Sequence, residues 1–231
     1  MQSVNIGWSA PRIHGELLKL GIEISQATVS KYMARHRNPP SQTWRTFLDN
    51  YVTDLASMDF FTVPIATFRL LYVFIVLRHG RREIVHFNVT TNPTAQSTAQ
   101  QIVEAFPFDT APRNLLRDRD RICGDAVQRR IKSLGVKEVM TTPRSPWQKP
   151  FVERVIGSIR RDCFDHVIVL NERRLHRILS EYFSYHHTCR TQLSLSKDSP
   201  KPRTVEAPDL GKVTAFTFVG GPHHRYGRLA A

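Results

Sequence analysis

Three carboxylates from distant parts of a strongly basic chain are the residues best placed to do chemistry. They are Asp59 in ASMDFFTVP, Asp118 in NLLRDRDRICGD and Glu153 in SPWQKPFVERVIGSIRRDC. Hard cations take oxygen ligands, and two ions held by shared carboxylates can stabilise both the attacking and the leaving oxygen of a phosphoryl transfer. The three acids therefore predict a divalent-metal site for phosphoryl-transfer chemistry.

The stretch around Glu153 has the pattern of an amphipathic helix that begins at or just after Pro150, since proline is favoured in a first helical turn. Its apolar stripe is formed by Val152, Ile156, Ile159 and Cys163. Glu153 lies beside this stripe and faces outward, with Arg160 and Arg161. A glutamate in a first turn is also favoured by the helix dipole alone, so helix stabilisation is the alternative explanation of this residue.

The elements that must position these acids can be predicted from hydrophobic patterning. Strands are predicted at 55–62, 69–78, 83–89, 114–117 and 136–140, and helices at 93–106, 125–134, 152–163 and 172–185. The first strand carries Asp59, and the fourth ends directly before Asp118. The order βββαβαβαα, with three antiparallel strands followed by parallel ones, is typical of a ribonuclease H-like α/β fold. It brings the first and fourth strands side by side, so that their acids can meet the glutamate of the later helix.

Two short helices are predicted before this core. Gly21 would end the first, and Ser25 would cap the second, whose apolar face carries Val29, Tyr32 and Met33. The pair is typical of a helix-turn-helix, in which the second helix contacts DNA, although a plain helical hairpin has the same pattern. The expected DNA-contacting residues of this second helix are Gln26, Thr28, Ser30 and Lys31.

Composition favours a nucleic-acid partner. The formal net charge is +13, and 41% of the residues are hydrophobic, which argues against a disordered basic tail. The three cysteines include no C-x-x-C pair, which favours a reducing compartment. The longest apolar run, 70–77, is far shorter than a membrane span requires. We expect a cytoplasmic, nucleoid-associated protein with no membrane partner.

The segments ASMDFFTVP, LLRDRDRICGD and SPWQKPFVERVIGSIRRDC together resemble the catalytic core of insertion-sequence transposases of the retroviral-integrase (DDE) type. The later segment YHHTCRTQLSLSKDSP is similar to the family's Y-N-x-x-R-x-H-x-x-L region, so the resemblance covers roughly 54–208. It implies a partial helix-turn-helix segment at 1–37, a linker at 38–53, an integrase-type core at 54–187 and a C-terminal tail at 188–231. No role is predicted for residues 211–231.

The resemblance also implies an activity, namely metal-dependent phosphodiester cleavage and strand transfer of insertion-element ends. Asp59, Asp118 and Glu153 would bind two Mg²⁺ ions, with Mn²⁺ as a substitute. The cations expected to hold DNA phosphates are Lys149, Arg154, Arg160 and Arg161. The partners would be the element ends and the target DNA. Because two ends must be held together, the resemblance implies at least a dimer on DNA.

Two questions stay open at this stage. Asp120 is the reserve candidate for the second metal ligand, because acids at i and i+2 of an extended segment face the same side. Asp118 is preferred, since 35 positions separate it from Glu153, nearer the family's usual separation. Asp120 also replaces the usual Gly of the motif, and Lys149 stands where Asn or Gly is common. The alternative functions are a truncated, inactive relic that binds DNA or a full-length partner and, less favoured, a structure-selective nuclease.

Overall fold

The computed structural model describes residues 10–19, 22–33, 46, 51–118, 120, 122, 124–142, 148–218 and 223–229. The chain divides into two compact units, 1–43 and 44–231. Of the predicted linker at 38–53, the structure describes only residues 46 and 51–53. No helix among the residues that the structure describes has the length and apolar character needed to cross a membrane.

The first unit contains two helices, α1 (Ala10–Lys19) and α2 (Gln26–Tyr32). Ser25 caps α2 as predicted, because its hydroxyl accepts a hydrogen bond from the Thr28 backbone N–H at 3.1 Å. Val29 is buried, whereas the side chain of Tyr32 is 79% exposed, so the predicted apolar face is wrong at this position. Tyr32 is the last residue of a seven-residue helix, and its ring lies 5.9 Å from the Lys31 ammonium. The predicted helix end at Gly21 lies outside the described residues.

The second unit is built on a five-stranded mixed sheet with the strand order β3-β2-β1-β4-β5. The strands are β1 (Leu55–Pro64), β2 (Leu70–Arg78), β3 (Glu83–Thr90), β4 (Asn114–Arg117) and β5 (Lys137–Met140). The first three pair in antiparallel fashion, and β4 runs parallel to both β1 and β5. This is the predicted topology, with the first and fourth strands adjacent.

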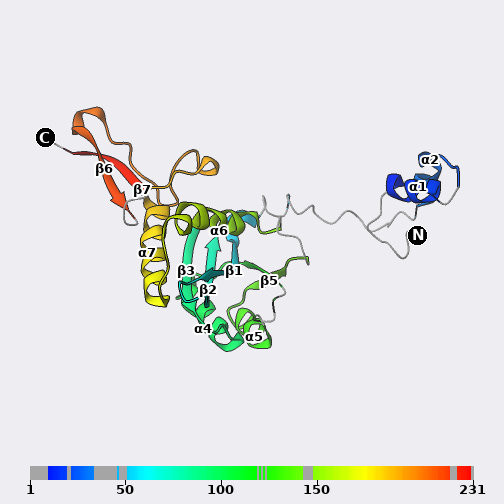
Figure 1. Ribbon diagram of the computed structural model, residues 1–231, viewed down its shortest axis with the longest axis horizontal. Coiled ribbons are helices and arrows are strands. Elements are labelled where there is room, and N and C mark those ends of the chain that lie inside the picture. The colour runs from blue at the N-terminus through cyan, green and yellow to red at the C-terminus, as the bar shows by residue number, and fades with distance from the viewer. Residues whose placement is uncertain are drawn as a thin grey trace. The chain divides into compact units, whose positions relative to one another are not determined.

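Helices cover both faces of the sheet (Figure 1). They are α4 (Ala95–Ala105) and α5 (Asp125–Ser133) on one face, and α6 (Pro150–Asp162) and α7 (Glu172–Thr188) on the other. β2 is apolar on both faces, as its continuous apolar run predicts: Phe74 packs with α4 and α5, while Val73 and Ile75 pack with α6 and α7. The sheet therefore has no solvent-facing side at its centre.

Short 3₁₀ turns connect several of these elements, at Val52–Asp54, Phe164–His166, Leu193–Leu195 and Pro208–Leu210. The N-terminus of α5 has no side-chain cap. Asp125 is the first residue of α5, and Gly124 occupies the N-cap position without a side-chain hydrogen bond. Asp125 therefore supports α5 through its charge near the positive end of the helix dipole.

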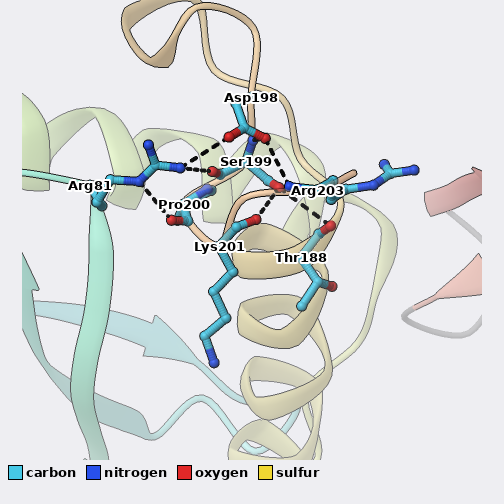
Figure 2. A network of polar contacts seen from close by, with 7 residues as sticks. All are labelled: Arg81, Thr188, Asp198, Ser199, Pro200, Lys201 and Arg203. Atoms are coloured by element: carbon cyan, nitrogen blue, oxygen red, sulfur yellow. Dashed lines mark hydrogen bonds and ion pairs between the residues drawn. The ribbon is translucent and has the colours of Figure 1, made fainter. Parts of the chain in front are cut away.

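The C-terminal part contains a two-stranded antiparallel hairpin, β6 (Lys212–Phe218) and β7 (His223–Leu229), that the sequence analysis did not predict. The Phe218 ring lies 5.9 Å from the ring of Tyr185 on α7. Upstream of the hairpin, a polar network joins the chain to the β2–β3 turn (Figure 2). The guanidinium of Arg81 donates hydrogen bonds to the Asp198 carboxylate at 3.1 Å and to the Ser199 carbonyl at 2.8 Å. This network fixes the segment after α7 against the core.

Candidate active site

The parallel pairing of β1 and β4 places Asp59 and Asp118 near each other. Ser57 pairs with Leu116, and each aspartate lies two residues beyond this pair. Because side chains alternate along a strand, Asp59 projects from the same face of β1 as Phe61, which packs in the core shared with α6 and α7. Both acids thus belong to the side of the sheet that α6 covers.

The Lys149 ammonium lies between these two carboxylates. Its Nζ is 2.8 Å from Asp59 Oδ2 and 2.7 Å from Asp118 Oδ2. The Lys149 side chain is 2% exposed and that of Asp59 is 11% exposed, whereas the Asp118 side chain is 41% exposed. The cluster is therefore buried on the Asp59 side and open to solvent on the Asp118 side.

Burial and charge shift the pKa values of Asp59 and Lys149 in opposite directions. Burial raises the pKa of Asp59 to about 6, and the neighbouring Lys149 ammonium limits the rise. Burial alone would lower the pKa of Lys149, but the two carboxylates outweigh it and raise that pKa above its usual value. Lys149 is therefore a charged ammonium at neutral pH, and Asp59 remains ionised beside it.

Asp118 is positioned by residues of β4 and of the turn after β5. The hydroxyl of Thr141 donates a hydrogen bond to Asp118 Oδ1, and the Thr141 backbone N–H donates to the Arg117 carbonyl at 3.0 Å. The buried Arg117 side chain donates to the Asp118 carbonyl at 2.8 Å and forms an ion pair with Glu138 on β5. The carboxylate is thus oriented before any ligand arrives.

Glu153 stands apart from this pair. α6 begins at Pro150, as predicted, and all four residues of its predicted apolar stripe are buried. Glu153 is exposed in the first turn, and no hydrogen bond or ion pair joins its carboxylate to another described residue. Within the described ranges, no three acidic, histidine or cysteine side chains lie close enough to hold a metal ion. The structure thus brings together two of the three predicted acids. Asp120, the reserve candidate, is exposed.

The cations predicted to hold phosphates fall into two groups. Arg154, Arg160 and Arg161 are exposed on α6, as a phosphate-contacting role requires. Lys149 instead contacts two carboxylates, and its side chain is 2% exposed. The Arg82 guanidinium stacks over the Phe151 ring of α6 at 3.5 Å from its centroid. In the first unit, the predicted DNA contacts on α2 are all exposed: Gln26, Thr28, Ser30 and Lys31.

Sequence reasoning missed the residues that support Asp118. Arg117 and Glu138 form a charge pair across two strands, but only the register of β4 and β5 reveals that they meet. Thr141 directly follows a short strand, a position that by itself suggests only a turn. Lys149 departs from the family pattern, but this departure does not reveal its ionic contacts with the two aspartates.

The two strand acids fit a divalent cation. Their Oδ2 atoms converge on one point that already holds a positive charge, and carboxylate oxygens are the ligands that Mg²⁺ and Mn²⁺ prefer. The three-acid site predicted from the sequence would need the Glu153 carboxylate as well. It would also need the Lys149 ammonium to release the oxygens that it now contacts.

No family model matches the chain, and no curated protein matches it. Among solved structures, a chain of the cryoEM structure of the simian T-cell lymphotropic virus intasome in complex with PP2A regulatory subunit B56 gamma is 12% identical, with a TM-score of 0.53 over 90% of this chain and 81% of that chain. The catalytic domain of Mos1 mariner transposase is 12% identical, with a TM-score of 0.51 over 65% of this chain and 85% of that chain. The same catalytic domain with Raltegravir and Mn gives a TM-score of 0.52. At this identity the likeness shows the fold: the α/β core is ribonuclease H-like, of the type found in integrase and transposase catalytic domains.

Proposed function

We propose that this protein is a DNA transposase or integrase that cleaves phosphodiesters at the ends of an insertion element and joins them to target DNA. One observation carries this proposal. Within an integrase-type fold, Asp59 of β1 and Asp118 after β4 aim their carboxylates at one cation-sized point. Glu153 opens the helix that covers the same face of the sheet. The net charge of +13 supports a polyanionic substrate.

The chain would hold Mg²⁺, or Mn²⁺ as a substitute, as two ions through Asp59, Asp118 and Glu153. When bound, the metal supplies charge stabilisation for the attacking and leaving oxygens of an in-line displacement. The chain's own residues orient the ligands: the Phe60 backbone N–H donates to Asp59 Oδ1 at 2.9 Å, and the Thr141 hydroxyl donates to Asp118 Oδ1.

The exposed arginines of α6 would hold the phosphates of the DNA. Arg154 is next to Glu153, and Arg160 and Arg161 lie two turns further along the same helix. Each phosphate contact releases counterions, so affinity should fall steeply with salt while carrying no sequence information. These residues would therefore position the DNA near the acids.

Sequence preference would come from the first unit. Exposed polar side chains occupy the N-terminal half of α2, where a helix-turn-helix makes base and phosphate contacts. Changing Gln26 to Ala should reduce the preference for the element's own ends, and Lys31→Gln should weaken binding to all sequences. Unchanged end preference in the Gln26→Ala variant, together with unchanged affinity in the Lys31→Gln variant, would rule out this DNA-reading role. Since two ends must be joined, the protein is expected to act as at least a dimer on DNA, which mass photometry of the complex can measure.

The test of the activity is metal-dependent nicking and joining of DNA that carries the gene's own flanking sequences. Products should form with Mg²⁺ or Mn²⁺ and be lost in Glu153→Gln, which removes a ligand charge with little change in shape. Glu181→Gln, on the exposed face of α7, is the matched control and should leave the products unchanged. Normal joining by the Glu153→Gln protein would overturn the assignment.

A second candidate function is DNA binding without chemistry, as expected of an inactive relic. The Lys149 ammonium favours it, since it occupies the two carboxylate oxygens that a metal would use. The same assay separates the two functions. Binding of the flanking DNA with no products at any metal concentration would establish the non-catalytic protein.

A further inference from the structure

Lys149 occupies an unusual place for a lysine. It is the N-cap of α6, a position that favours Asn, Asp, Ser or Thr because their side chains accept a hydrogen bond from the first turn. A lysine has no acceptor, and α6 has no side-chain cap. Lysines are also rarely buried unless they are paired. The side chain therefore does not support the helix, and its two ionic contacts explain its burial.

One carboxylate oxygen of each aspartate already accepts a hydrogen bond from the protein. Asp59 Oδ1 accepts a hydrogen bond from the Phe60 backbone N–H, and Asp118 Oδ1 accepts one from Thr141. The Oδ2 atoms are left to bind a cation, and the Lys149 ammonium contacts both, at 2.8 and 2.7 Å. A divalent ion that used these oxygens would lie within a few ångströms of a fixed positive charge, and like charges at that distance in a partly buried site repel strongly.

We propose that Lys149 is an internal cation that competes with the divalent metal for Asp59 and Asp118, and so sets how tightly this chain binds metal. This inference rests on the proposed function, because it takes the two aspartates to be metal ligands. Metal entry requires the ammonium to leave both oxygens. The flexible four-carbon side chain and the solvent-open Asp118 side of the cluster provide a route for that movement.

The position also predicts which substitution removes the competition. Asparagine at 149 carries no charge, and its side-chain oxygen can cap α6. Lys149→Asn should therefore leave the two carboxylates available to a metal ion while improving the start of the helix. Lys149→Met, of similar length, removes the charge without adding a cap and serves as the second neutral variant. Lys149→Arg retains the charge and should keep metal binding weak.

The experiment is titration of the full-length, DNA-free protein with Mn²⁺, in which electron paramagnetic resonance measures the free ion. Lys149→Asn and Lys149→Met should bind Mn²⁺ about tenfold more tightly or better than the unaltered chain. Their melting temperatures should rise more on addition of Mn²⁺. Lys132→Asn, which removes an exposed lysine of α5, is the matched control and should leave the affinity unchanged.

Adding Asp118→Asn to the Lys149→Asn variant separates the possible results. Loss of the tighter binding in the double variant supports the competition. Equal affinity of the unaltered and Lys149→Asn proteins, with binding still dependent on Asp118, overturns the competition and leaves the proposed function standing. No Mn²⁺ binding by any of these proteins overturns both.

Discussion

The two strand-borne acids and the helix-borne acid of the candidate site are held in opposite ways. Asp59 and Asp118 each use one carboxylate oxygen for a hydrogen bond from the protein and the other for the Lys149 ammonium. Glu153 is exposed, with no such partner in the part of the chain that the structure describes. The sheet therefore fixes one half of the site, while the helix presents the other half to solvent.

This difference follows from burial. An ionised carboxylate that is taken out of water needs hydrogen bonds and a counter-charge, which Phe60, Thr141 and Lys149 provide. A carboxylate in solvent is hydrated and needs neither, so Glu153 can remain without a protein partner at no cost to the stability of the fold. We therefore expect the two kinds of acid to contribute alike to the rate of strand joining but unequally to the stability of the fold.

The largest expected effect is on chemistry, and here the two kinds of acid should behave alike. Asp118→Asn and Glu153→Gln should each lower the rate of strand joining by at least about a hundredfold, because each removes the charge of a proposed metal ligand. Chelation of the metal with EDTA should stop joining in the unaltered protein. Single-turnover assays on flanking DNA measure this, with binding followed in parallel. If only the strand acid mattered, the helix acid would not belong to the site.

The next largest effect is on stability, and here the strand acids and the helix acid should differ. Asp59→Ala should destabilise the metal-free protein by about 3–5 kcal/mol, because it leaves the buried Lys149 ammonium with one carboxylate partner. Glu153→Ala should change stability by less than about 0.5 kcal/mol, as surface substitutions do. Urea denaturation in EDTA gives both values. Equal losses of unfolding free energy in the two variants would show that Glu153 contributes as much to the stability of the fold as the strand acids.

Much of this architecture could be predicted from sequence, because it depends on periodicity. The strand order, the start of α6 at Pro150 and the stripe ending at Cys163 all follow from local patterns. The hairpin β6–β7 was not predicted, although the run VTAFTF at 213–218 is rich in β-branched and aromatic residues. The partners of Asp118 escaped prediction for another reason. They come from three separate segments, and contacts between segments depend on register and on side-chain direction, which no local pattern contains.

The stability of the core that α6 and α7 share should be sensitive to pH. His186 of α7 is buried, with Nε2 3.3 Å from the Arg82 carbonyl. Burial, aided by the positive charges of His187 and Arg190, lowers the pKa of His186 to about 4 from its usual 6.5. The folded protein thus binds fewer protons than the unfolded chain between these values. Stability from this group is complete above about pH 6.5 and falls by up to about 3 kcal/mol as the pH drops towards 4.

His186→Gln should flatten this part of the pH profile, since glutamine does not titrate. Chemical denaturation of both proteins at pH 7 and at pH 4.5 measures the effect as a difference of differences. His224→Gln, an exposed histidine of β7, is the control and should leave the slope unaltered. An identical slope in the His186→Gln protein would mean that other groups carry the acid sensitivity.

The smallest effect concerns how rigidly Asp118 is oriented. Thr141→Val keeps the shape of a buried side chain but removes the hydroxyl that donates to Asp118 Oδ1. We expect a loss of about 1–2 kcal/mol in stability and a fall of about tenfold in joining rate, because a carboxylate with one oxygen released can rotate away from the metal position. Thr142→Val is the matched control, since Thr142 is exposed and its hydrogen bonds to described residues are with Gln148 rather than with Asp118. A normal joining rate in Thr141→Val would show that the backbone of β4 and the contact with Lys149 suffice to orient the strand acid. In that case the sheet itself, rather than the side chains around it, would hold Asp59 and Asp118 in place, while Glu153 on α6 stays free to adjust.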